Sequence, residues 1–279
     1  MLNLFRKGIT RHETNASIVG QSPMFGTSVT TGASSSTKGT AVQLIASTAF
    51  DAYLVRVTCG GYGSAGLASE GCLDILLGAA TEHVLIPNLL MGYCGGLDTT
   101  SADVGPKSWL FPLYIPSGTR IAAQAAGART SAACYVTVDL YGGNGYPDFE
   151  PGTRVTTYGI GTVPNGVTIT PGASGATGSW TQITASTSEE HKYLVPSFQV
   201  STDLTTNRRH FTVEMGIGAA TEELISQPYR FQTGTNEFMS SIEGIPQRLD
   251  IPSGTRLVMR ASNSGTNDGP YNGVIHGVS

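Results

Sequence analysis

The chain has 279 residues, of which only 13% are charged, a formal net charge of -4, and 36 glycines. An average soluble protein has about 25% charged residues and about 7% glycine, so this composition favours turns and strands over helices. The sixteen Lys and Arg residues form no basic stripe, which argues against direct binding of nucleic acid.

The first 24 residues differ from the rest of the chain because they have no sustained hydrophobic period. No similar segment precedes the second half, so we interpret residues 1–24 as an arm. The arm is either a disordered terminus or a segment that becomes ordered on a neighbouring subunit. We expect Phe5, Arg6 and Arg11 to be contact residues, because no domain core requires them. The early charges rule out a signal peptide and no apolar run is long enough for a membrane helix, which predicts synthesis in the cytoplasm and no membrane contact.

Two short peptides occur twice and in the same order. IPSGTR occupies residues 115–120 and 251–256, and GAATE occupies residues 78–82 and 218–222. Such a pair predicts an internal duplication. The expected units are the arm at 1–24, a first β-sandwich repeat at 25–143, a linker at 144–157 and a second β-sandwich repeat at 158–279.

Short runs rich in β-branched and aromatic residues fill both halves and are separated by turn signals. In the first half they are residues 41–45, 52–58, 72–77, 82–87, 109–115, 120–125 and 134–141. In the second half they are residues 181–184, 193–200, 211–215, 223–226, 247–251, 256–260 and 274–276. This pattern predicts an all-β fold of two tandem antiparallel, jelly-roll-like β-sandwiches. A helical turn is expected only near residues 86–91.

The IPSGTR peptide has the composition of a tight turn. Proline sets the first corner, Ser-Gly completes the turn, and Thr-Arg begins the next strand. We therefore interpret it as a hairpin turn rather than as a binding loop.

The four cysteines, Cys59, Cys72, Cys94 and Cys134, all lie in the first half. A disulfide or zinc site that the domain requires should occur in both halves. We therefore predict free, buried thiols, with a disulfide and a metal site as the less favoured alternatives.

No motif in the sequence indicates catalysis or a cofactor. Residues 61–66 match GxGxxG, but the run leads into a strand instead of opening a helix, so we interpret it as a loop. The five histidines form no ligand pair, the loop that holds Asp98 and Asp103 lacks calcium-binding spacing, and no GxSxG sequence occurs. We therefore expect no enzyme, no metal and no cofactor.

Aromatic residues in or next to the predicted loops provide the alternative function, which is carbohydrate binding. Tyr93 and Trp109 are candidate contacts for a sugar ring, as in other sandwich proteins. A position in the core or in an interface is the competing explanation for both.

The order of a strand, IPSGTR, an apolar strand and a closing strand at residues 136–142, set behind a basic arm, resembles virion structural proteins of tailed bacteriophages. The resemblance covers residues 32–279. It implies a virion protein made in the bacterial cytoplasm that contacts capsid, neck or tail proteins as a decoration, head fibre, collar or tail-accessory component. It also implies self-assembly, as a trimer or a hexamer-like ring. The alternative is a phage adhesin or carbohydrate-binding module that contacts host surface glycans.

Overall fold

The computed structural model describes residues 9–15, 26–62, 70–78, 81–92, 106–143, 145, 147–172, 175–200, 209–219, 221–226, 228–234, 237–238, 242–265 and 271–279. Within these ranges every regular element longer than one residue is a strand, which confirms the predicted all-β class. None of these residues belongs to a helix long and apolar enough to cross a membrane.

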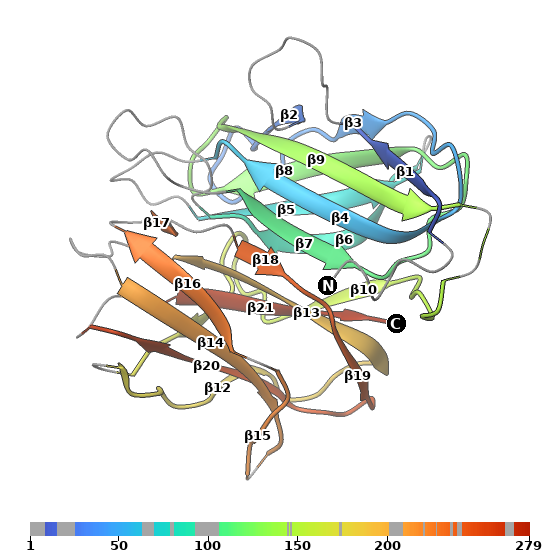
Figure 1. Cartoon of the computed structure of the whole chain (residues 1–279). Coiled ribbons are helices and arrows are strands. Elements are labelled where there is room, and N and C mark those ends of the chain that lie inside the picture. Colours follow the sequence, from blue (N-terminus) through green and yellow to red (C-terminus); the bar gives the residue numbers. More distant parts are fainter. Residues whose placement is uncertain are drawn as a thin grey trace.

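The first half of the chain forms two sheets, one of which also includes β18 from the second half, paired in parallel with β7 (Figure 1). The strands of one sheet follow the order β1-β9-β4-β7-β18, with β2 also paired to β9. Their bounds are β1 Arg11–Thr14, β2 Thr27–Thr30, β4 Ala52–Gly60, β7 Lys107–Phe111, β9 Ala133–Gly142 and β18 Ile242–Gly244. The other sheet follows the order β3-β8-β5-β6. Its strands are β3 Val42–Ile45, β5 Gly71–Leu77, β6 His83–Leu90 and β8 Ile121–Gly127.

The second half also forms two sheets, with the orders β10-β21-β13-β19 and β12-β20-β14-β16-β17. In addition, β11 pairs with β21 and β15 pairs with β14. The bounds are β10 Val155–Tyr158, β11 Val167–Ile169, β12 Thr181–Thr184, β13 His191–Val200, β14 Arg209–Ile217, β15 Glu223–Leu224, β16 Tyr229–Gly234, β17 Glu237–Phe238, β19 Gln247–Ile251, β20 Leu257–Asn263 and β21 Tyr271–Val278.

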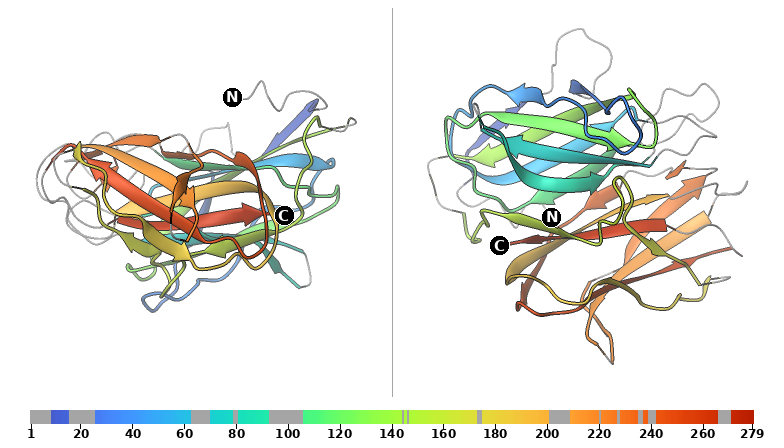
Figure 2. Two further views of the ribbon diagram at one scale, coloured as in Figure 1. Left: turned by 90° about the horizontal axis from the view of Figure 1, so that it is seen from below. Right: turned by 180° about the vertical axis from the view of Figure 1, so that it is seen from behind.

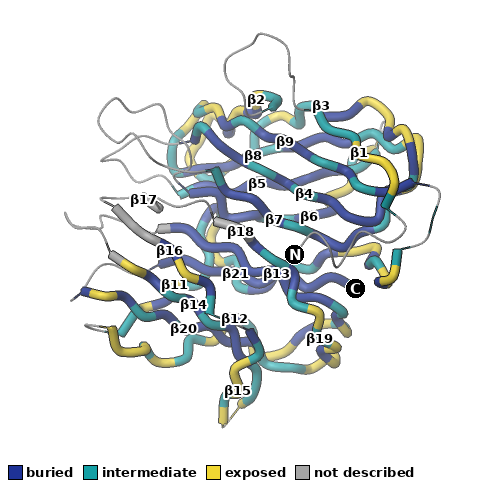
Figure 3. The backbone as a smooth tube through the Cα atoms, in the orientation of Figure 1, coloured by how far each residue is buried: buried dark blue, intermediate teal, exposed yellow. Residues whose placement is uncertain are grey.

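The two halves lie one above the other, with β13 and β21 at their boundary (Figures 1 and 2). Both strands are buried along most of their length, as Figure 3 shows. The hydrophobic cluster that holds Val55 and Phe111 of the first half also holds Tyr193 and Val195 of β13. The core of the first half therefore continues across the boundary.

Two local expectations differ from the structure. The helical turn expected at residues 86–91 is wrong, because β6 continues to Leu90 and pairs with β5. The predicted linker at 144–157 overlaps β10, which pairs with β21 between Val155↔Val278 and Tyr158↔Ile275. In both places pairing with a partner strand determines the backbone conformation, and for β10 that partner lies more than a hundred residues away.

The arm is only partly covered by the described residues. Residues 11–14 form β1 on β9 of the same chain, and Thr10 N donates to Gly142 O at 2.8 Å. This part of the arm is therefore neither a free terminus nor dependent on a neighbouring subunit for its order.

Candidate functional site

The arm joins the first sheet at the edge of β9. Thr14 pairs with Asp139, and Thr27 of β2 pairs with Val136. Thirteen positions separate Thr14 from Thr27, but only three separate their partners on β9. β1 and β2 thus follow one another along a single strand edge.

The side chain of Asn15 fills the gap between β1 and β2. Its Nδ2 donates to Val136 O and to Thr27 Oγ1, both at 3.0 Å, and its Oδ1 accepts from Val138 N at 2.7 Å. An amide side chain carries the same donor and acceptor groups as a peptide unit. Asn15 therefore replaces the main-chain bonds that a continuous strand would make to β9.

Side chains of β1 add further contacts. Glu13 Oε2 accepts from Ala49 N at 2.9 Å. The ring of His12 stacks on Tyr141 with 4.9 Å between centroids, and its Nε2 lies 3.1 Å from Asp139 Oδ1. β1 is thus bound through its side chains as well as through its main chain.

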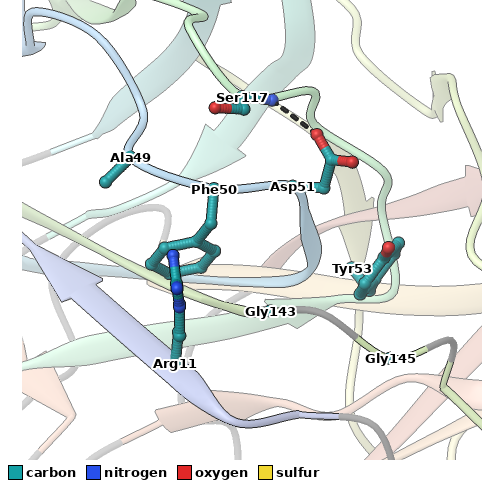
Figure 4. A pocket seen from close by; sticks show the side chains of 8 residues that line it. All are labelled: Arg11, Ala49, Phe50, Asp51, Tyr53, Ser117, Gly143 and Gly145. Carbon is teal, nitrogen blue, oxygen red and sulfur yellow. Dashed lines mark hydrogen bonds between the residues drawn. The ribbon is translucent and has the colours of Figure 1, made fainter.

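A pocket of about 310 Å³ opens beside β1 (Figure 4). Its lining residues are Arg11, Ala49, Phe50, Asp51, Tyr53, Ser117, Gly143 and Gly145. Asp51 Oδ1 accepts from Ser117 N at 2.7 Å, which ties the pocket to the first IPSGTR turn. Gly143 has a φ of +129°, and a Cβ there would lie 2.2 Å from Thr10 Oγ1, so only glycine fits. The arm, the shared turn and the end of β9 therefore meet at one polar pocket.

The two predicted candidate residues that the structure describes, Arg11 and Trp109, lie on different strands and line no common site. Arg11 is exposed on β1 and lines this pocket, whereas Phe5, Arg6 and Tyr93 lie outside the described residues. Trp109 is only 1% exposed, and its Nε1 donates to Ser197 Oγ at 3.1 Å. Its ring therefore belongs to the contact between the halves and offers no face to a sugar.

The cysteines that the structure describes agree with the prediction of buried thiols. Cys59, Cys72 and Cys134 are buried thiols that form no disulfide. Cys94 lies outside the described residues. Burial raises the pKa of the Cys72 thiol, which keeps it protonated and unreactive.

Both IPSGTR peptides form turns, but neither is a hairpin. The first leads from Ile115, which bridges to Ala52, to β8 in the other sheet of the same half. The second leads from β19 to β20, again in different sheets. The hairpin interpretation is wrong because the segments on either side of each turn pair with different partners. The glycines Gly118 and Gly254 have φ values of +82° and +86°, as turn chemistry requires.

The strands before and after each GAATE peptide form the hairpins instead, and an arginine joins each hairpin to a turn. In the first half Arg120 Nε donates to Gln43 Oε1 at 3.1 Å, and its Nη1 donates to Gly78 O at 3.2 Å and to Glu82. We call this group of four residues the first arginine clamp. The last residue of one shared peptide thus binds the first and last residues of the other.

The second half contains the same arrangement. Arg256 Nε donates to Gln182 Oε1 at 3.0 Å, and its Nη1 donates to Gly218 O at 2.5 Å and to Glu222 Oε1 at 2.9 Å. The hydrogen bond from Arg256 holds the pKa of Glu222 below its usual value. We call these four residues the second arginine clamp. Sequence reasoning explained the turn but missed the function of its arginine.

Threonine hydroxyls close both turns in the same way. In the first half Thr48 Oγ1 and Thr119 Oγ1 donate to Pro116 O at 2.8 and 2.7 Å. In the second half Thr187 Oγ1 and Thr255 Oγ1 donate to Pro252 O at 2.9 and 2.7 Å. The repeated hydrogen bonds extend beyond the repeated letters, because Thr48 and Thr187 lie outside the shared peptides.

Buried polar side chains join the two halves. Ser197 Oγ accepts from Leu90 N at 2.8 Å and from Trp109 Nε1. Gln199 Oε1 accepts from Gly71 N at 3.1 Å. Lys107 is 1% exposed, and its Nζ donates to Phe198 O at 3.0 Å. These directional bonds fix the orientation of the halves, because a shift would leave buried polar atoms without partners.

His276 lies at the same boundary and is fully buried. Thr157 Oγ1 donates to Pro87 O at 2.6 Å and lies 2.8 Å from His276 Nδ1. Since the threonine proton is used on Pro87, Nδ1 of the neutral imidazole must be the donor to Thr157. Burial lowers the pKa of His276 to about 3.

No protein-family model and no curated protein matches the sequence. Among solved structures, the major capsid protein of Sulfolobus Turreted Icosahedral Virus is 9% identical with a TM-score of 0.32, and 96% of each chain is covered. PNGase F, a glycosylasparaginase from Flavobacterium meningosepticum, is 9% identical with a TM-score of 0.35, with 97% of this chain and 96% of that chain covered.

Two further solved structures are similar at the same level. A tandem carbohydrate-binding module from Paenibacillus barcinonensis is 11% identical with a TM-score of 0.28, with 99% of this chain and 92% of that chain covered. PNGF-II is 8% identical with a TM-score of 0.35, with 96% of this chain covered but only 65% of that chain. At these scores no activity, ligand or assembly can be transferred to this chain.

One expectation is corrected by this comparison. The prediction that the protein is not an enzyme is wrong as a general exclusion, because the similar all-β structures include PNGase F, which is an enzyme. The sequence argument was based on the motifs of other folds, and a chain of β-sandwiches can form an active site without them.

Proposed function

We propose that this protein is a structural component of a virus particle that assembles with copies of itself. The observation that carries the proposal is that the arginine clamp occurs twice. The peptides common to both halves are used to hold a turn against a hairpin, and thus to set the shape of a module. Buried bonds at Ser197, Gln199 and Lys107 then join the two modules in one orientation. Rigid modules in a fixed arrangement suit a subunit that must fit a regular lattice.

The finer proposal concerns the place of the protein on the particle. We infer an attachment to the head, neck or tail of a tailed bacteriophage, as a decoration, head fibre, collar or tail-accessory component made in the host cytoplasm. The proposed repeats are residues 25–143 and 158–279, which would have arisen by duplication. Since β1 is held by its own chain, the residues before it are the proposed anchor, with Phe5 and Arg6 as contacts and Arg11 at the base of the anchor.

Two measurements test the self-assembly and the location. Mass photometry and sedimentation velocity of the purified protein should show discrete oligomers at micromolar concentration. Immunogold labelling with an antibody against the purified protein should decorate virus particles from infected host cells. A protein that stays monomeric at all concentrations, or particles that carry no label, would contradict the proposal.

A deletion tests the anchor. Removing residues 1–8 leaves β1 and Asn15 in place, so the truncated protein should fold and oligomerise normally. It should nevertheless be absent from particles purified from cells that express it during infection. The full-length chain, expressed with the same tag, is the control, and equal incorporation of both forms would contradict the anchor.

The carbohydrate-binding alternative gains no support from the described residues. Trp109 is buried. The ring of Trp180 is covered by Arg260, whose Cζ lies 4.2 Å from the ring centroid.

A further inference from the structure

The two GAATE hairpins present the same pattern of exposure to solvent. In β5–β6, Thr81 is exposed, Glu82 is half-buried in the clamp, and the two residues that follow are exposed; the residues of β14–β15 at 221–224 repeat this order. Val84 is 48% exposed and Leu224 is 49% exposed, and they are the exposed large hydrophobic side chains among the described residues. Both halves thus expose an aliphatic side chain to solvent at the equivalent position of the hairpin.

Each of these side chains projects from a fixed backbone. Leu224 lies opposite Gly216 in the β14–β15 pairing, and Val84 lies opposite Leu76 in the β5–β6 pairing. The arginine clamps hold the turns of both hairpins through Gly78 O and Gly218 O. An exposed aliphatic residue on a rigid hairpin costs little conformational entropy when it is buried by a partner.

The second hairpin also borders a pocket of about 360 Å³. Its lining residues are Ala185, Ile217, Gly218, Ala219, Thr221, Glu223, Gly254, Thr255 and Arg256. The pocket combines apolar side chains with the carboxylate of Glu223 at its border. It is therefore suited to a hydrogen-bonding side chain such as an imidazole.

The first hairpin carries such a side chain next to its exposed aliphatic residue. The residue before Val84 is His83, which is exposed, whereas the residue before Leu224 is Glu223, which is also exposed. Contact between two copies of the second hairpin would place two carboxylates together. Contact between the first hairpin and the second would place an imidazole against a carboxylate and one aliphatic side chain against the other. Charge complementarity therefore favours unlike hairpins over like ones.

We propose that the β5–β6 hairpin of one copy docks on the β14–β15 hairpin of a second copy. The two edge strands then lie side by side, so that Val84 contacts Leu224 on one face and His83 faces Glu223 and the pocket on the other. Such a head-to-tail contact leaves one free hairpin at each end of a pair, so further copies add until a ring closes. This inference rests on the proposed self-assembly and assigns the surface that produces it.

Complementary variants test the contact. Val84→Asp removes the first hairpin from the contact, and Leu224→Asp removes the second. Each change should weaken self-association at least about 30-fold, because a carboxylate would be buried in an apolar contact. Each variant alone should therefore be monomeric. Their equimolar mixture should form a 1:1 dimer and nothing larger, because one intact hairpin of each kind remains to pair.

A charge exchange gives a second measurement. His83→Glu and Glu223→Lys should each weaken self-association, and the chain that carries both changes should recover oligomers close to those of the wild type. Asp250→Lys, at an exposed position on β19, is the control. Circular dichroism should show the same strand signal for all variants.

The outcomes separate this inference from the proposed function. If the wild type forms oligomers but both Asp variants keep them, another surface is responsible and the inference fails alone. If the mixture stays monomeric, the two hairpins do not pair with each other, and if one variant alone still dimerises, the contact joins like hairpins; either result overturns the inference. If the wild type is monomeric throughout, the proposed self-assembly fails with it.

Discussion

Arg120 and Arg256 show how much one side chain contributes to this fold. Each guanidinium donates to a glutamine, a main-chain oxygen and a glutamate. The planar group of arginine can address several acceptors in fixed directions, which the point charge of lysine cannot do. Both side chains are about one-fifth exposed, so the bonds are shielded only in part from water.

We expect Arg120→Lys and Arg256→Lys each to lower the free energy of unfolding by about 1–2 kcal/mol, through loss of the bonds to the glutamine and the glycine carbonyl. The effects should add in the double variant, because the two clamps share no residue. Urea unfolding measures them. Arg230→Lys, at an exposed position on β16, should change stability by less than about 0.5 kcal/mol. Equal stability of all variants would show that the clamps are not structural.

At the scale of elements, β1 depends on one amide side chain. We expect Asn15→Ala to remove the hydrogen bonds that Asn15 makes to Val136 O and Val138 N and to release the arm strand locally, at a cost of about 1–3 kcal/mol. Hydrogen-exchange mass spectrometry should show faster exchange in peptides covering residues 9–15 and 133–142. Peptides from β19 and β20 serve as the internal reference. Unchanged exchange at β1 would mean that its main-chain bonds to β9 suffice.

Most strands could be predicted from the sequence, because a run of β-branched and apolar residues requires little information about the partner strand. Residues 181–184 are an example, since they form β12 with the predicted bounds. β1 could not be predicted in this way. It has four residues, of which only Thr14 favours a strand, and its partner lies more than a hundred residues away. Long-range pairing of this kind overrides local propensity.

The candidate site was less predictable than the strands. Arg11 was singled out because it had no place in a core, and it does line a pocket. The two clamps were missed, although the identical peptides were the signal that could have revealed them. Turn chemistry explains proline, serine and glycine in IPSGTR but not its arginine. A charged residue that turn geometry does not require indicates a distant partner.

At the scale of the whole molecule, the boundary between the halves determines the response to acid. His276 is buried there as a neutral imidazole, and burial lowers its pKa to about 3, whereas an unfolded chain has a histidine pKa of about 6.5. Between these values the unfolded state binds a proton that the folded state does not. The contribution of the neutral His276 to the free energy of unfolding is therefore fully present above the unfolded pKa, and it is lost as the pH falls below that value.

We expect His276 to contribute a loss of up to about 1.4 kcal/mol for each pH unit below about 6.5. Burial also lowers the pKa of His191, which adds a loss in the same direction. Urea unfolding at several pH values between 4 and 7 measures the slope. His276→Asn should make this slope shallower, whereas His210→Asn, at an exposed position on β14, should not. An unchanged slope in His276→Asn would contradict this account.

The arginine clamps also affect how the sequence can change. Glu82 and Arg120 are 38 residues apart. A mutation of either residue removes the partner of the other, so the two positions should change together. A substitution at one position leaves an unpaired charge until a second substitution compensates for it. The strands between them need only an apolar residue at alternate positions and can drift freely. This difference accounts for a chain whose halves share two short peptides and little else.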